Sequence, residues 1–352
     1  VRAGNDNGHV GSMELGLVQD TGKAGLWPGG FLNVRAEGRL SDGILARAGT
    51  ITPVTNDAIF PNVPGRLGED VFALNELSYM QFFSEQFGVI LGLINTDTGD
   101  SNPIAGFIGS DEYFLNTGFL YSSVTAALAP TATLGGGLIY IHDEQNQFSF
   151  LVIGTSETAG FNPFDLYGGT TFIGEWNTTY EAFDKPGGMT LAGYYGVDHS
   201  RFTAVTDNRI LIASALTGQQ LRSGDTTWAI SWNGYQYFQG DENQGWGIFG
   251  RFGLADGNPN INRWNAAAGF GGVGLFPCRP ADRWGIGVFH QDFTDTGLLP
   301  FLGIDDETGG EVFYNLSLCP GIDLTLDLQV VDSALPGVDN VVVGGARIRM
   351  DW

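Results

Sequence analysis

The chain ends in Val341-Val-Val-Gly-Gly-Ala-Arg-Ile-Arg-Met-Asp-Trp352, in which apolar or small residues alternate with charged ones. Every second position holds one apolar set: Val342, Gly344, Ala346, Ile348, Met350 and Trp352. The positions between them hold Gly345, Arg347, Arg349 and Asp351. Successive side chains of a strand point to opposite faces of the sheet, so this stretch predicts a strand with one apolar face. Apolar residues on one face with an aromatic residue at the end are typical of the closing strand of an outer-membrane barrel.

The composition supports an all-β membrane protein. Glycine is frequent, with 54 of 352 residues, and the mean hydropathy of +0.00 is too low for a bundle of membrane-spanning helices. It suits a barrel in which half of each strand faces lipid and half faces water. The 16 basic and 39 acidic residues give a net charge of −23, which argues against nucleic acid as a partner because phosphate binding needs a basic surface.

Alternating segments recur along the whole chain, and the sequence predicts sixteen strands in a single antiparallel barrel spanning residues 1–352. Residues 1–11 are predicted to be an N-terminal extension. No signal peptide is visible, and Val1 is not an initiator residue, so we interpret the chain as a mature or trimmed one. The clearest segment is 322–332, where Leu324, Leu326 and Leu328 alternate with polar residues. The predicted strands are 12–20, 30–41, 44–52, 71–84, 86–96, 131–142, 146–155, 170–183, 188–199, 225–238, 245–256, 261–276, 283–294, 309–319, 322–332 and 341–352.

The connections between these segments alternate in length. Most short connections follow even-numbered predicted strands, and the long ones follow odd-numbered strands: 53–70, 97–130, 156–169, 200–224 and 295–308. Three connections after odd-numbered strands are shorter: 21–29, 257–260 and 333–340. A barrel with short periplasmic turns and long extracellular loops produces this bias, whereas a soluble sandwich has no reason to sort its loops by end. Sixteen strands enclose a water-filled channel, so the sequence predicts a pore.

If lipid covers the apolar face, the other face lines the channel. Because the last strand is expected to pair with the first, basic residues of three predicted strands would form one arc on the inner wall: Arg35, Arg39, Arg47, Arg347 and Arg349. Glu37 lies within this arc, and Glu175 and Asn177 face it from half a circumference away. Such a wall exchanges hydrogen bonds with solute hydroxyls, and arginine donates several bonds at once. The alternative is that these arginines and glutamates pair with each other and stiffen the wall.

Several motifs resemble chemical sites without completing them. Gly269, Gly271 and Gly274 match G-x-G-x-x-G, but strand pattern lies on both sides, so close approach of strands explains them better than a dinucleotide site. Asp97 and Asp100 weakly resemble a calcium loop that lacks its final glutamate. The histidines are far apart, and no nucleophile elbow is present. We therefore expect no enzyme activity, no metal site and no cofactor, with a loop-bound Ca²⁺ near Asp97 and Asp100 as the open alternative.

The two cysteines, Cys278 and Cys319, are placed at the same rim of the predicted barrel, at the ends of neighbouring strands. Because the periplasm is oxidising, a disulfide between them is expected, and two unpaired thiols are the alternative.

Two stretches are similar to the carbohydrate-selective porin B family of Gram-negative outer membranes. The first is Gly245-Trp-Gly-Ile-Phe-Gly-Arg-Phe-Gly-Leu-Ala-Asp-Gly-Asn-Pro-Asn260, and the second runs from Trp264 to Gly287. Further similar residues lie at 20–30, 53–54, 76–77, 314–315 and 327–330. Cys278 departs from the family pattern, which has glycine in this turn, and the loops 97–130 and 200–224 diverge.

The resemblance implies a sixteen-stranded barrel through which sugars diffuse inward, narrowed by extracellular loops that fold into the channel. Loops 53–70 and 97–130 are the expected constriction loops. The pore-lining residues implied by matching positions are Arg35, Glu37, Glu76, Arg251 and Asn315. The implied location is the outer membrane of a Gram-negative bacterium, with mono- or oligosaccharides, lipid and lipopolysaccharide as partners. The strand ending in Trp352 is expected to engage the barrel-assembly machinery.

Three functions remain open at this point: a carbohydrate-selective channel, a general-diffusion pore whose acidic loops favour cations, and a soluble β-rich lectin or glycan-acting enzyme. The acidic residues invoked for the second are Glu69, Asp70, Asp97, Asp100, Asp305, Asp306 and Glu307. For the first, replacement of Arg35 and Arg39 by alanine is predicted to weaken block by sugar and to increase cation selectivity.

Overall fold

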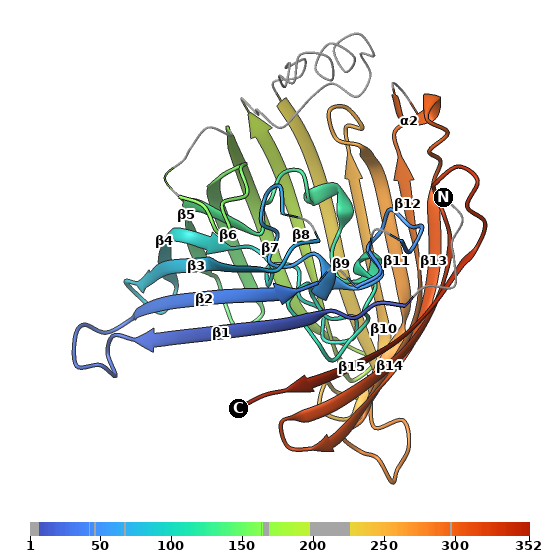
Figure 1. The fold of residues 1–352 in the computed structure, drawn as a ribbon. Helices are drawn as coiled ribbons and strands as arrows, with labels where there is room; N and C mark the ends of the chain where they lie inside the picture. Colours follow the sequence, from blue (N-terminus) through green and yellow to red (C-terminus); the bar gives the residue numbers. More distant parts are fainter. Residues whose placement is uncertain are drawn as a thin grey trace.

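A computed structural model describes residues 7–352 other than 42, 46, 67, 163, 165–168, 198–225 and 296–297. The described residues form one antiparallel sheet of 15 strands, in which each strand pairs with the next along the chain. The sheet curls around a central space into which several connections fold (Figure 1). Its strands are β1 (Gly11–Asp20), β2 (Gly30–Leu40), β3 (Val71–Phe82), β4 (Phe87–Asn95), β5 (Ala132–Ile141), β6 (Asn146–Gly154), β7 (Thr170–Ala182), β8 (Lys185–Val197), β9 (Thr226–Gly240), β10 (Gly245–Ala255), β11 (Asn262–Val273), β12 (Arg283–Phe293), β13 (Glu307–Cys319), β14 (Ile322–Asp332) and β15 (Val341–Met350).

Fifteen of the sixteen predicted strands are confirmed, and the prediction of a strand at 44–52 is wrong. Residues 43–45 and 47 instead form turns, in which Ala48 N–H donates to Ile44 C=O over 2.7 Å. The N–H groups of Ile51 and Thr52 donate to the Glu307 carboxylate rather than to a neighbouring strand. Residues 41–70 are therefore one long connection, and every long connection now follows an even-numbered strand. The predicted loop 200–224 lies outside the described residues, as do residues 1–6 of the predicted extension.

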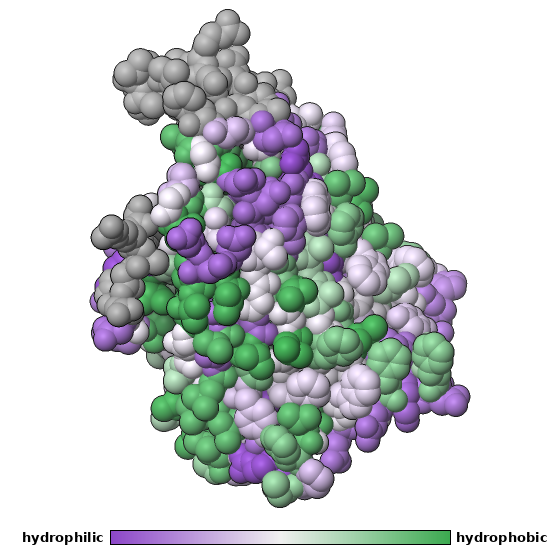
Figure 2. Space-filling model, turned by 90° about the vertical axis from the view of Figure 1, so that its right-hand side faces the viewer, coloured by the Kyte–Doolittle hydropathy of each residue, from purple (hydrophilic) through white to green (hydrophobic). Residues whose placement is uncertain are grey.

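The predicted alternation of faces is confirmed where it was clearest. In β14, Leu326, Leu328 and Val330 are 47%, 49% and 47% exposed, whereas Thr325, Asp327 and Gln329 between them are buried. In β15, Val342, Ile348 and Met350 lie exposed on the same outer face. Figure 2 shows apolar side chains across the middle and lower part of one face, with hydrophilic ones gathered in its upper part and along its lower right edge. The sheet thus turns an apolar surface outward without a second protein layer over it, among the described residues.

The predicted pairing of the last strand with the first is not found. Among the described strands, β1 pairs only with β2, and β15 pairs only with β14. An odd number of antiparallel strands makes β1 and β15 run in the same direction. A residue of the connection 41–70 links the two edges instead: Asp57 accepts from Ser12 Oγ of β1 over 3.4 Å and lies 3.5 Å from Arg347 Nη1 of β15.

The helices are short and lie in the connections. They are η1 (Asn56–Ala58), η2 (Thr117–Phe119), η3 (Ser123–Thr125) and α2 (Leu298–Phe301). None of the described helices has the length and apolar character needed to cross a membrane. The first three belong to the connections β2–β3 and β4–β5, which fold into the space inside the sheet and pack buried apolar residues such as Phe114 and Phe119 against its inner face.

Candidate functional site

The β4–β5 connection, residues 96–131, fills one half of the space inside the sheet. Phe114 and Phe119 stack with their ring centroids 4.3 Å apart. Phe313 of β13 and Phe289 of β12 approach these rings edge-on, at 4.8 Å from Phe114 and 5.4 Å from Phe119. All four are buried, so the connection packs its aromatic side chains against the inner face of the sheet as a hydrophobic core.

Arg251 of β10 anchors this connection. Its side chain is fully buried and forms an ion pair with the Asp100 carboxylate. Its Nη2 also donates to the backbone C=O groups of Asp100 and Gly106, over 2.9 and 2.8 Å. A loop folded into a protein interior carries backbone carbonyls that need donors. Arg251, predicted to line the pore, therefore serves as a tether for the loop.

Arg39 of β2 holds the β2–β3 connection in the same way. Its Nη2 donates to the backbone C=O groups of Arg66 and Glu69 over 2.8 and 3.3 Å. The side chain is 1% exposed, so it does not face an open channel. The guanidinium offers five donors in a fixed plane, which suits the binding of several carbonyls at once.

Three buried glutamates perform the complementary task and bind backbone N–H groups of the inward loops. Glu311 of β13 accepts from the N–H groups of Leu115 and Asn116 over 2.7 and 2.9 Å. Glu307 accepts in the same way from residues 51 and 52, and Glu157 from residues 131 and 132. Charge-assisted bonds of this kind are among the stronger hydrogen bonds in proteins. The sequence reading missed the tethering role of all three glutamates.

The remaining predicted pore-lining residues of β2, β3 and β13 also bind neighbouring side chains of the sheet. Arg35 lies 2.5 Å from Glu14 and 3.4 Å from Glu37, which is itself buried. Glu76 accepts from Ser78 Oγ over 2.8 Å. Asn315 donates to Thr325 Oγ1 over 2.9 Å and is buried. For these residues the structure agrees with the alternative drawn from the sequence, in which polar and charged groups of the wall pair with one another instead of facing the solute.

The two arginines of β15 bind the β2–β3 and β4–β5 connections near the edge of the sheet. Arg347 donates to Asn56 Oδ1 over 3.3 Å and to Tyr113 C=O over 3.4 Å. Arg349 forms an ion pair with Glu112. Arg47, predicted on a strand, lies in a turn and donates to Gly43 C=O over 2.9 Å, because the strand predicted at 44–52 does not form.

Open space remains on the opposite side, against the inner faces of β4 to β9. We call this side the open half of the lumen, and the inner faces of β10 to β15 and β1 to β3 with their bound loops the tethered half. The upper cavity, toward the long connections, measures about 430 Å³. Its polar side chains are Asn95, Asp97, Asp100, Thr125, Gln147, Ser149, Glu175 and Tyr194, together with Asn62, Thr96, Thr98, Tyr121 and Thr131.

A lower cavity of about 560 Å³ lies toward the short turns. Gln147 lines both cavities, and Asn177 of the lower one donates to Glu175 Oε1 of the upper one over 2.6 Å. The two cavities therefore adjoin. The other polar side chains of the lower cavity include Asn102, Asn146, Thr178, Thr179, Thr190, Asn233 and Tyr235. Glu175 and Asn177 are thus predicted pore-lining residues that line these two cavities.

The charge along this route is of one sign. Among the described residues that line the two cavities there is no lysine, arginine or histidine, whereas six are acidic: Asp97, Asp100, Asp143, Glu144, Glu175 and Glu242. Burial raises the pKa of Asp97 well above its usual range, and repulsion from Glu37 adds to this. At the lower end, the N–H of Gln145 donates to the Asp143 carboxylate and lowers its pKa. Of these two carboxylates, Asp97 is therefore the one that loses its charge at the higher pH.

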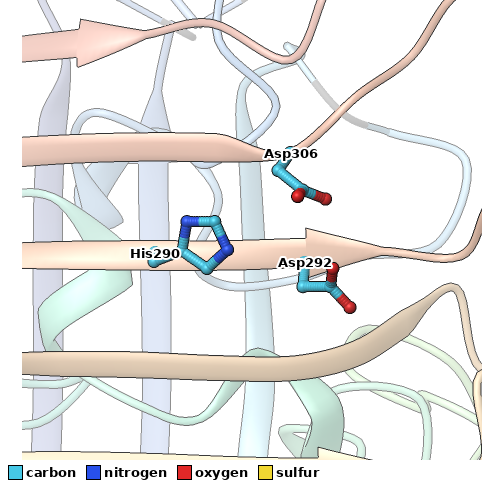
Figure 3. A group of neighbouring side chains, drawn as sticks. All are labelled: His290, Asp292 and Asp306. Carbon is cyan, nitrogen blue, oxygen red and sulfur yellow. The ribbon is translucent and has the colours of Figure 1, made fainter.

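The geometry gives little support to the calcium alternative, because the Asp100 carboxylate is engaged by Arg251. Within the described part of the chain, one group of possible metal ligands comes together elsewhere, at His290, Asp292 and Asp306, with ligand atoms within 4.8 Å of one another (Figure 3). Arg263 donates to both oxygens of Asp292 over 2.7 and 2.8 Å. A metal ion at this group would have to compete with that arginine.

The predicted disulfide is not present. Cys278 and Cys319 are free thiols, both exposed, at the rim formed by the short turns. The turn that contains Cys278 is fixed by Arg279, which donates to the Asp282 carboxylate over 2.7 and 2.8 Å and to Ser317 C=O over 2.9 Å. These bonds close the turn onto β13 without a covalent link.

The cavity-lining residues of β6 and β8 were missed at the sequence level. Gln147 and Ser149 occupy alternate positions of β6. Thr190 and Tyr194 are four residues apart on β8, so their side chains also lie on one face of the sheet. The alternation that located the arginines would have located these positions as well. No signal in the sequence distinguishes an inner position facing water from one covered by a returning loop.

A curled antiparallel sheet with an apolar outer face, inward-folded loops and adjoining polar cavities defines a porin-type channel protein. The model of the carbohydrate-selective porin, OprB family matches residues 5–352, and the chain belongs to that family. Family membership confirms the predicted function, a porin that allows passive, carbohydrate-selective diffusion of sugars. It indicates a channel rather than an enzyme or a soluble lectin.

Solved structures agree with the fold. The high-pH structure of Pseudomonas putida OprB aligns over 97% of this chain and 87% of that chain, with 19% sequence identity and a TM-score of 0.78. The low-pH structure of the same protein aligns over 97% of this chain and 84% of that chain, with 14% identity and a TM-score of 0.55. A search of curated proteins found no match.

Proposed function

We propose that sugars cross this porin through the two adjoining cavities of the open half, and that the arginines of the tethered half hold the constriction loops instead of contacting the solute. The observation that carries this proposal is the position of the cavities, which lie against β4 to β9. Arg39, Arg251 and Arg347 are bound to loop carbonyls or carboxylates on the other side.

The route suits hydroxyl-bearing solutes. A sugar that leaves water must replace its hydrogen bonds, because unpaired polar groups cost free energy. Glu175 and Asn177 offer acceptors, Thr190 a hydroxyl group and Tyr194 a phenol, all on β7 and β8. Together with the amides of Gln147 and the other lining residues, they form a continuous series of hydrogen-bonding groups from the upper cavity to the lower one.

The membrane setting follows from the outer face. We infer that the sheet forms a closed transmembrane cylinder in the outer membrane, with lipid and lipopolysaccharide against its apolar surface, long loops outside the cell and short turns in the periplasm. A closed antiparallel ring needs an even number of strands, so the proposal requires a sixteenth strand between β1 and β15, antiparallel to both. Recognition of the last strand by the barrel-assembly machinery belongs to the same proposal.

Preference for cations over anions is a second property that the lining supports. Five lining carboxylates besides Asp100, which is paired with Arg251, and no basic side chain among the described lining residues raise the local concentration of cations. Passage of neutral sugars and preference for cations are compatible, since the sugars carry no charge.

A recording in a planar lipid bilayer tests the proposed route. Added glucose or maltose is expected to reduce the ion current at millimolar concentrations, because a bound sugar displaces ions from the cavities. Replacement of Asn177 by alanine should weaken this block, whereas replacement of Asn315, buried in the tethered half, should leave it unchanged. The proposal is contradicted if neither sugar blocks the current, or if the substitutions of Asn177 and Asn315 change the sugar block equally.

A further inference from the structure

The upper cavity has an unusual inner wall. The lumen of a transmembrane barrel is normally polar. In β6, however, the inner positions change along the strand from Gln147 and Ser149 to Leu151 and Ile153. Ile139 occupies the corresponding inner position of β5. One side of the cavity is therefore aliphatic.

Part of this aliphatic surface has a structural role, and part of it is open. Ile94, Ile153 and Ile173 are at most 5% exposed and form a small core under Ala129 of the β4–β5 connection. Ile90 and Leu151 pack at the edge of that core and, like Ile139, are only half-buried while they line the cavity. We define the aliphatic wall as Ile90, Ile139 and Leu151.

The remainder of the same cavity is lined by polar groups and by apolar loop residues such as Ile59, Phe60 and Ile108. Glu175 of β7 and Tyr194 of β8 lie on the sheet, and Asp97, Asp100 and Thr125 lie on the loop. A cavity of about 430 Å³ is large enough for a small organic solute. It combines apolar surface with hydrogen-bonding groups, and it carries acidic but no basic side chains among the described residues.

We propose that the upper cavity is a binding subsite for a neutral glycoside with an apolar aglycone. The aglycone lies on the aliphatic wall, and the sugar hydroxyls face Glu175, Tyr194 and Thr125. This inference rests on the proposed route through the open half. A free hexose has a smaller apolar surface and gains less from the wall, and an anionic glycoside is repelled by the carboxylates.

The test compares two probes in the bilayer recording, methyl β-glucoside and 4-nitrophenyl β-glucoside. The native porin is expected to be half-blocked by the aryl glycoside at about 10-fold lower concentration, as when roughly 60 Å² of apolar surface leaves water. Leu151→Asn keeps the side-chain size but removes the apolar surface, so it should abolish most of this preference and leave block by methyl β-glucoside unchanged. Val152→Thr, at the neighbouring outward position, should retain the full preference.

The outcomes separate this inference from the proposed route. Equal block by the two glycosides in the native porin overturns the subsite and leaves the route intact. A preference that survives both Leu151→Asn and Ile139→Thr also overturns it, because the wall is then not the contact surface. If neither glycoside blocks the current, the proposed route through the open half is contradicted as well. Heat-dependent mobility in SDS gels identifies folded variants, and Ile139→Thr serves if Leu151→Asn does not fold.

Discussion

The two halves of the lumen use similar residue types for different tasks. In the tethered half, arginines and glutamates are buried and bind backbone groups of loops, as Arg251 does with Gly106 and Glu311 with Leu115. In the open half, Glu175 and Asn177 bind each other and face a cavity. The difference lies in what stands opposite the wall. A loop that folds inward brings backbone N–H and C=O groups that need partners, and charged side chains of the wall bind them. Where no loop covers the wall, its polar side chains can bind the solute instead.

The largest effect is expected from Arg251→Ala. The change removes one partner of a buried ion pair and two hydrogen bonds to the loop. Loss of a buried charge pair costs about 3–5 kcal/mol, so the loop should detach and the single-channel conductance should rise roughly two-fold. Recordings of conductance and the temperature of the SDS-gel mobility shift measure both effects.

The control for that change is Arg66→Ala, since the exposed pair between Arg66 and Glu69 contributes little. Conductance of Arg251→Ala equal to that of the native porin would mean that the loop is held mainly by its aromatic residues.

A smaller widening is expected from Arg39→Ala, which frees the carbonyls of Arg66 and Glu69 in the β2–β3 connection. The connection retains its bonds to Glu307, so only part of it should move. The conductance should increase by about half, as expected when a few hydrogen bonds of roughly 1–2 kcal/mol each are lost. Weaker sugar block at unchanged conductance would instead restore the original prediction that Arg39 contacts the solute.

Replacing Asn177 by alanine together with Thr190 by valine tests the open half. Thr190 Oγ1 donates to Asn177 Oδ1, so the pair forms one hydrogen-bonding unit at the junction of the cavities. Loss of bonds worth about 1 kcal/mol in total should raise the sugar concentration for half-block about five-fold. Ion conductance should stay close to native, because no charge or large volume changes. Unaltered sugar block in this double variant would place the binding groups elsewhere.

The smallest effect concerns pH. Burial raises the pKa of Asp97. Repulsion from Glu37 and Glu157 raises this pKa further, whereas attraction to Arg35 lowers it. The carboxylate is charged above this raised pKa and neutral below it. Cation selectivity, read from the reversal potential in a salt gradient, should therefore begin to fall at a pH above the ordinary value of about 4 for aspartate. Asp97→Asn should remove the part of this decline that begins above about pH 4. Identical pH profiles of cation selectivity for the native porin and Asp97→Asn would contradict the assignment of this decline to Asp97.

Much of the fold was predictable because period-two alternation is a local property. Leu326 and Leu328 reveal their face through their own neighbours in the sequence. The error at 44–52 has the same origin. Alternation around Arg47 resembles a strand, but no neighbouring strand pairs with it, and the buried carboxylate of Glu307 satisfies the backbone at residues 51 and 52 instead.

The site was harder to predict, because facing inward and lining the path are different properties. Arg35, Arg39, Arg251 and Arg347 face inward as predicted, yet each binds a wall carboxylate or a loop. Their role depends on where residues 53–70 and 96–131 fold, and that is a matter of long-range packing such as the contacts of Phe114 and Phe119. The same loops leave Gln147 and Tyr194 uncovered, which alternation alone does not show.

Accessibility of single cysteines tests the division of the lumen most directly. In a background in which Cys278 and Cys319 are replaced by serine, Ser149→Cys places a thiol in the upper cavity and Asn315→Cys places one in the tethered half. A water-soluble cationic thiol reagent is predicted to reduce the current through the Ser149→Cys channel and to leave the Asn315→Cys channel unchanged. A fall in current for Asn315→Cys with none for Ser149→Cys would contradict the account, because the open path would then follow the arginines.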